Sequence, residues 1–337
     1  MTDIILPVRM YRGDALLMLS EDKAKPLIED MLYENDYIML VGDPKTNKSI
    51  LSMQMACALT TGNSFLGVFD VPEAVNVWYF ATEGKDEDNK DRLVRMSNKV
   101  GIDSDRFTLF CSVSLTFNGP HSRQHIQAIY QENKEHLPSV IIIDSIYAGF
   151  VGSLTKDEDV IRFHRNIRWL AEQCGAAVIL VHHLRKDQMD MRGNVVKKTD
   201  SATYGSVYFM GSVDHCFMIT AWEPKDDEDK DKCKKDRYLR CDTQRSGHIS
   251  SGIRLRLHEP DPLYLDIVSK HEHEKKELLS ILSKKPNGMT VAEILKRFSG
   301  SRALFYIVIK ELLGEHQVTK SGAKTKKYAP MNTCVPL

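Results

Sequence analysis

The stretch Gly42-Asp-Pro-Lys-Thr-Asn-Lys48-Ser49 decides the fold of this 337-residue chain. It follows an apolar, β-branched run over residues 37–41 and precedes a helical pattern over residues 49–59. Strand, loop and helix in this order are the setting that the phosphate-binding pattern G-x-x-x-x-G-K-[ST] requires. Successive backbone N–H groups of such a loop bind phosphate oxygens, and the start of the helix adds the positive end of its dipole.

The chemistry of this loop assigns roles to its residues. Lys48 is expected to contact the β- and γ-phosphates, and the Ser49 hydroxyl to ligate Mg²⁺. ATP and Mg²⁺ are therefore the expected cofactors. The predicted nucleotide contacts are Gly42, Asp43, Pro44, Lys45, Thr46, Asn47, Lys48 and Ser49.

Asn47 stands where the second glycine of the pattern belongs. That position commonly needs a positive φ, which Asn tolerates best among residues with a Cβ. We expect the loop to keep its geometry at a cost of about 1 kcal/mol. Two questions stay open: whether the added side chain weakens nucleotide binding, and whether ATP is hydrolysed efficiently.

Two acidic residues end predicted strands. Asp144 ends the apolar run Val140-Ile-Ile-Ile-Asp144, the Walker B arrangement, in which the carboxylate holds the Mg²⁺ shell with Ser49. The alternative for Asp144 is a cap of the next turn. Glu83 ends the second strand, where it can orient and deprotonate the attacking water. The alternative for Glu83 is a solvated loop acid.

His182 and His183 end the fifth predicted strand. A single histidine there is usually structural. A polar pair at a strand edge that faces the γ-phosphate can instead report the nucleotide state, and both interpretations remain open.

Alternating strands and helices indicate the fold class. Near-continuous apolar runs such as residues 140–143 indicate strands buried on both faces, as in a parallel sheet covered by helices. We therefore predict an α/β core with a mostly parallel, twisted sheet. Its strands are expected at residues 37–41, 75–80, 107–110, 139–144, 177–181, 215–220, 238–241 and 252–257, and its helices at 49–59, 88–100, 121–135 and 157–174.

After about residue 270 the pattern changes to helix, helix, helix and a short basic hairpin. Thr290 and Glu293 form a capping box at the start of a helix predicted to end at Phe298. The other elements are expected at residues 271–283, 302–313, 317–320 and 326–329. This order predicts a winged helix-turn-helix domain over residues 271–330, after an N-terminal segment (1–36) and an ATPase domain (37–265).

The net charge of zero hides a segregation of charge. Residues 271–337 hold 12 Lys+Arg against 6 Asp+Glu, and residues 1–270 hold 34 against 40. The basic C-terminal part keeps a nucleic-acid partner possible. No apolar run reaches the ~18 residues of a membrane span, and seven scattered cysteines lack a C-x-x-C pair. We expect a cytoplasmic protein with reduced thiols, no membrane partner and no zinc site.

Over roughly residues 20–257 the chain resembles the RecA-like ATPases of the RepA type, which are hexameric replicative helicases and related plasmid and phage proteins. The resemblance rests on the phosphate loop, residues 54–67, 77–83, 141–144 and 181–186, and Gly205-Ser206. It implies a RecA-like core in a ring, hexameric in the family's manner, with ATP between subunits. It also implies single- or double-stranded DNA and a replication protein as partners.

The resemblance also implies catalytic roles. Glu83 is similar to the family's catalytic base, and His182 or His183 to its sensor of the γ-phosphate. The family supplies an arginine finger across the subunit interface. Arg245 is our candidate for it, ahead of the alternatives Arg192 and Lys186. Besides Asn47, two positions depart from the family: Tyr204 replaces an Arg, and Thr243 replaces a Lys.

Two regions are candidates for DNA contact. Residues 185–198 form a polar stretch after the fifth strand that suits a channel loop, or else a flexible surface connection. The C-terminal unit offers a basic wing, or else a protein-binding or merely solvated face. Its basic residues are Arg302, Lys310, Lys320, Lys324, Lys326 and Lys327.

The sequence thus predicts an ATP-dependent DNA-binding motor of the helicase type. A nucleotide-gated DNA-binding or regulatory protein that hydrolyses ATP weakly or not at all is the alternative. A recombinase-type filament is a third possibility, which differs in its assembly.

Overall fold

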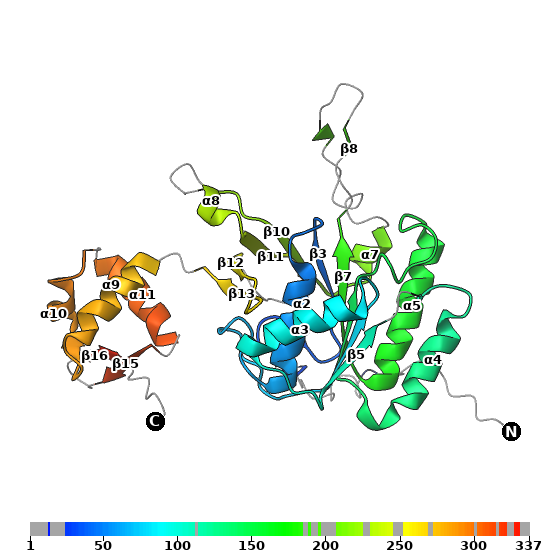
Figure 1. Cartoon of the computed structure of the whole chain (residues 1–337), viewed down its shortest axis with the longest axis horizontal. Coiled ribbons are helices and arrows are strands. Elements are labelled where there is room, and N and C mark those ends of the chain that lie inside the picture. The colour runs from blue at the N-terminus through cyan, green and yellow to red at the C-terminus, as the bar shows by residue number, and fades with distance from the viewer. Residues whose placement is uncertain are drawn as a thin grey trace.

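The computed structural model describes residue 13 and residues 24–111, 114–184, 188–189, 195–196, 207–224, 230–244, 252–268, 272–299, 302–314, 317–321 and 327–330. Nine strands within these ranges form one large sheet (Figure 1). They are β3 (Tyr37–Gly42), β4 (Val77–Ala81), β5 (Phe107–Cys111), β6 (Val140–Asp144), β7 (Ala177–His183), β10 (His215–Ala221), β11 (Asp236–Gln244), β12 (Ile253–His258) and β13 (Tyr264–Ile267). Their order is β13-β12-β11-β10-β3-β7-β6-β4-β5.

The sheet is parallel from β5 to β10 and antiparallel beyond it. The eight predicted strands are confirmed within a few residues. β13 was not predicted, because it is a run of only four residues that follows two prolines closely. Smaller pairs outside the sheet are β1 (Pro26–Ile28) with β2 (Leu32–Tyr33) and β8 (Gln188–Met189) with β9 (Val195–Val196).

Helices cover both faces of the sheet. Leu51 and Met55 of α2 (Lys48–Thr61) pack with Ile142 of β6, and Met96 of α3 (Asp86–Val100) joins the same core. The opposite core holds Ile141 of the same strand. It also holds residues of α4 (Ser122–Glu132) and α5 (Asp157–Cys174), with η1 (Lys134–His136) following α4 and α7 (Val207–Gly211) nearby. This two-sided burial explains why the central strands carry near-continuous apolar runs.

The C-terminal unit has its own apolar core, which includes Leu278, Phe305 and Leu312. Its elements follow the predicted order, and the winged-helix identification remains a prediction. They are α9 (Glu272–Ser283), β14 (Met289–Thr290), α10 (Val291–Leu295), α11 (Arg302–Gly314), β15 (Val318–Ser321) and β16 (Lys327–Pro330). Figure 1 shows the unit on the β13 side of the large sheet.

The capping box of α10 is confirmed. The Thr290 hydroxyl accepts the Glu293 N–H at 3.3 Å, and the Glu293 carboxylate accepts the Thr290 N–H at 2.8 Å. α10 ends at Leu295, three residues before the predicted end, and Phe298 instead turns into the core of the unit. In the described part of the chain, no helix is both long and apolar enough to cross a membrane.

Candidate nucleotide-binding site

The phosphate loop joins the end of β3 to the start of α2, as predicted. Asn47 has φ 71° and ψ 27°, in the left-handed region, which confirms the expected conformation at this position. Gly42 is fixed for a different reason. A Cβ there would lie 2.2 Å from the Ile219 carbonyl oxygen on β10, closer than any side chain tolerates. The neighbouring strand therefore requires the first glycine of the pattern.

Lys48 is buried over the loop. Its Nζ donates hydrogen bonds to the carbonyl oxygens of Gly42 at 2.9 Å and Asp43 at 2.8 Å. Burial lowers the pKa of Lys48 to about 8, although Asp144, Asp43 and Glu83 act in the opposite direction. The ammonium group thus lies at the loop where the pattern places the phosphates.

The predicted metal ligands lie together. The Ser49 Oγ donates to Asp144 Oδ1 at 3.1 Å, and the Tyr79 hydroxyl donates to Asp144 Oδ2 at 2.6 Å. Ser52 on α2 lies 2.9 Å from the same tyrosine oxygen. Burial raises the pKa of the Asp144 carboxyl, and the hydrogen bonds from Tyr79 and Ser49 lower it. A hydroxyl and a carboxylate are the hard oxygen donors that suit Mg²⁺, which keeps its other positions for water and phosphate.

Glu83 is held in place rather than freely solvated. Ser145, which follows the β6 aspartate and is buried, donates from Oγ to Glu83 Oε1 at 2.5 Å. Thr82 in turn donates to the Ser145 carbonyl oxygen at 2.7 Å. The Glu83 side chain is 45% exposed, so water can reach the carboxylate.

The two neighbouring histidines have different surroundings. His183 Nε2 lies 4.0 Å from Glu83 Oε2. Burial and the nearby Lys48 lower the pKa of His183, which leaves its ring neutral at pH 7. His182 is buried and stacks on Phe209, with ring centroids 5.2 Å apart. His183 is therefore the member of the pair that lies beside the carboxylate, and its role as a sensor stays a prediction.

The candidates for the arginine finger fall outside the described residues. This applies to Arg245, Arg192 and Lys186, and also to Tyr204. Of the predicted channel loop, residues 185–198, the structure describes only the backbone of β8 and β9.

Three residues of the site were not predicted as functional. Tyr79 and Ser145 hold the two carboxylates, and Arg237 on β11 lies against the loop. Its Nη1 donates to the Asp236 carbonyl oxygen at 2.8 Å, while Nη2 is 3.5 Å from the Lys45 carbonyl oxygen. A phenol inside an apolar strand is a signal for Tyr79. No such signal distinguishes Arg237, because it belongs to a stretch of sequence that is rich in charges of both signs.

Comparison with known proteins adds a family match. A family model described as an AAA domain matches residues 14–189. No curated protein sequence matches the chain.

Three solved structures are similar to the chain at low sequence identity. The RadB recombinase is 16% identical, with a TM-score of 0.44 over 70% of this chain and 92% of its own. A KaiC-like protein from Pyrococcus horikoshii OT3 is 16% identical, with a TM-score of 0.46 over 72% of this chain and 94% of its own. The third structure, the ATPase domain of another protein, is 12% identical, with a TM-score of 0.48 over 67% of this chain and 82% of its own.

Proposed function

The chain belongs to the AAA-domain family, and we propose that it is an ATPase that couples ATP hydrolysis to work on DNA. The observation that carries the proposal is that Lys48, Asp144 and Glu83 lie close together at the carboxyl ends of the central strands. Lys48 belongs to the phosphate loop, Asp144 ends β6, and Glu83 follows the neighbouring strand β4.

In this proposal the loop N–H groups and Lys48 bind the phosphates of ATP. Ser49 and Asp144 would hold Mg²⁺, which when bound neutralises charge on the β- and γ-phosphate oxygens. Glu83 orients a water molecule and accepts its proton as the oxygen attacks the γ-phosphorus. The bond from the γ-phosphorus to the bridging oxygen breaks, and ADP and phosphate leave.

We propose further that the site is completed by a second copy of the chain in a ring, with six copies as the expected number. The exposure of Glu83 supports this, because a neighbouring subunit has room to cover the carboxylate. Arg245 of that neighbour is the proposed finger. A RecA-like core over residues 37–265 of the RepA type, carrying a winged-helix domain at 271–330, is part of the same proposal.

DNA is the proposed partner, and a helicase-like role in replication is the proposed use of the hydrolysis. The charge of residues 271–337, with 12 Lys+Arg against 6 Asp+Glu, supports contact with phosphates. Residues 185–198 are proposed to contact single-stranded DNA in the ring channel.

One observation favours the second candidate, a nucleotide-gated DNA-binding or regulatory protein that hydrolyses ATP weakly or not at all. Asn47 adds a side chain to the loop, and its buried Nδ2 has no hydrogen-bond partner within the described part of the chain. A polar group buried without a partner is unfavourable. In this candidate the added side chain of Asn47 weakens the contact between the loop and phosphate.

Phosphate release with and without single-stranded DNA distinguishes the two functions. We expect release that DNA stimulates and that Lys48→Ala abolishes. Binding of a fluorescent ATP analogue, measured on the same samples, shows whether the site is intact. Lys48-dependent binding without any Lys48-dependent release would establish the second candidate instead.

A further inference from the structure

A groove of about 630 Å³ lies between α4 and α5, away from the phosphate loop. Arg168 of α5 stacks over the ring of Tyr37, the first residue of β3. The phosphate loop begins at Gly42, the last residue of the same strand. The groove therefore lies at the amino end of β3, and the nucleotide site lies at its carboxyl end.

Aromatic rings orient two arginines of this groove. The guanidinium carbon of Arg123 lies 4.0 Å from the Trp169 ring centroid, and that of Arg168 lies 4.4 Å from the Tyr37 centroid. Stacking fixes the plane of a guanidinium and leaves its N–H edge available to an oxyanion. Arg168 also donates to the Ser212 carbonyl oxygen.

Two of the three arginines have N–H groups without a hydrogen-bond partner in the described chain, although Glu172 acts on the pKa of one of them, Arg123. Among the described residues, Arg123 and the exposed Arg165 have neither a hydrogen bond nor an ion pair. Glu172 is the one acidic residue that lines the groove in the described chain. The buried His164 adds no charge, because burial lowers its pKa to about 3. The groove is therefore strongly cationic.

Aromatic and basic side chains continue to alternate beyond the groove. Trp169 meets Tyr130 edge to face, with centroids 6.0 Å apart, and Lys134 lies 5.6 Å from the Tyr130 centroid. Surfaces that bind single strands combine basic side chains along the backbone with aromatic rings.

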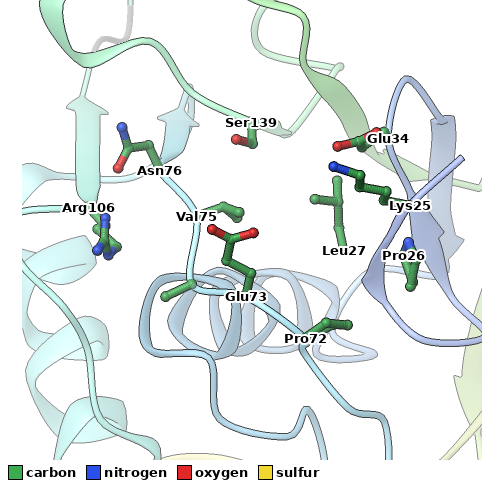
Figure 2. A pocket seen from close by; sticks show the side chains of 11 residues that line it. Lys25, Pro26, Leu27, Glu34, Pro72, Glu73, Val75, Asn76, Arg106 and Ser139 are labelled. Atoms are coloured by element: carbon green, nitrogen blue, oxygen red, sulfur yellow. The ribbon is translucent and has the colours of Figure 1, made fainter.

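Another cavity shows how the groove differs from an ordinary surface hollow. A cavity of about 490 Å³ lies near the beginnings of β4 and β6, and Figure 2 shows the side chains that line it. Lys25 and Arg106 line it together with Glu34 and Glu73, so that the opposite charges cancel. In the groove, by contrast, three arginines and one glutamate leave a net positive charge.

We propose that the α4–α5 groove binds the phosphate backbone of single-stranded DNA, as a contact separate from the ring channel and the C-terminal unit. The inference rests on the proposed function for the identity of the nucleic acid. A protein partner would have to supply acidic side chains opposite these arginines, whereas the phosphate backbone carries negative charge along its whole length. Ile161, at 36% exposure, is the one large apolar side chain exposed among the described lining residues.

The test uses the full chain without nucleotide and a fluorescein-labelled oligo-dT, followed by anisotropy over a salt series. We expect Arg123→Gln with Arg165→Gln to weaken binding about tenfold at low salt, and to reduce the slope of log K against log salt by about 1.4. Lys90→Gln with Arg106→Gln is the matched control, since it removes the same charge from exposed sites elsewhere. Thermal unfolding confirms that both double variants are folded.

The outcomes separate this inference from the proposed function. Groove variants that bind oligo-dT with the wild-type affinity and slope would overturn the groove contact and leave the function standing. Wild-type protein that fails to bind oligo-dT would overturn both. A change in oligomeric mass by light scattering, with DNA binding retained, would make the groove a contact between protein subunits and overturn the inference.

Discussion

The hydroxyl of Tyr79, a buried side chain, donates a 2.6 Å hydrogen bond to Oδ2 of the partly buried Asp144. The two residues stand on the paired strands β4 and β6, where Tyr79 is in register with Ile142 and Ala81 with Asp144. The tyrosine therefore holds the carboxylate from a diagonal position, and Ser49 holds its other oxygen. Together they fix the carboxylate that is proposed to hold Mg²⁺.

Tyr79→Phe should weaken the binding of ATP in the presence of Mg²⁺. The substitution leaves Asp144 Oδ2 without its donor, which costs about 1–3 kcal/mol in a buried setting. We expect the Mg²⁺ concentration for half-maximal binding of a fluorescent ATP analogue to rise several-fold. Tyr147→Phe is the control, because that side chain is 66% exposed. An unchanged Mg²⁺ requirement in Tyr79→Phe would show that the phenol is only a packing group.

Ser145→Ala should slow hydrolysis without weakening ATP binding. The alanine removes the donor that orients Glu83 Oε1, and a misplaced catalytic base loses part of a contribution of roughly 10²–10⁴. We expect the rate of phosphate release to fall about tenfold, as part of that contribution. Ser97→Ala, which removes only an exposed hydrogen bond within α3, should match the wild type. A parallel loss of ATP affinity in Ser145→Ala would contradict a role confined to Glu83.

Asn47→Ala and Asn47→Gly should differ in stability. Alanine in the left-handed region costs about 1–2 kcal/mol, whereas glycine adopts φ 71° without strain. Urea unfolding should therefore show a lower midpoint for the alanine variant than for the glycine variant. Glycine also removes the buried Nδ2, so we expect it to bind ATP at least as tightly as the wild type. Equal stabilities would mean that the loop relaxes out of this conformation.

ATP binding should weaken between pH 7.5 and 9.5. The pKa of Lys48 is lowered to about 8, so the free protein loses this positive charge within that range. If bound phosphate keeps the lysine protonated, affinity follows the protonated fraction and falls about tenfold by pH 9. Lys48→Ala should show weak binding without this slope. A wild-type affinity that is constant over the range would contradict the shifted pKa.

The same pKa sets the direction of the effect on folding. Lys48 has a lower pKa in the folded protein than in the unfolded chain, where it is near the ordinary value of 10.5. The unfolded chain therefore binds more protons between about pH 8 and 10.5, and the contribution of Lys48 to stability rises with pH across that window.

The sequence predicts the parts of the site that local patterns encode. The apolar runs of β3 and β6 are continuous because both faces of the sheet are covered, and Asn47 is recognisable because few residues accept its φ. The roles of Tyr79 and Ser145 depend instead on which strands are neighbours in the sheet. β4 and β6 are separated in the chain by α3, β5, α4 and η1, and only the register brings their side chains together.

Single-turnover phosphate release from Glu83→Gln tests the central claim. The claim is that the site formed by the phosphate loop, Asp144 and Glu83 hydrolyses ATP with Glu83 as the general base. The amide keeps the shape of the side chain and can no longer accept a proton from water. We predict binding of ATP and Mg²⁺ within about twofold of the wild type, and phosphate release slower by about 10² or more. Release at the wild-type rate from Glu83→Gln, with ATP bound normally, would contradict the account.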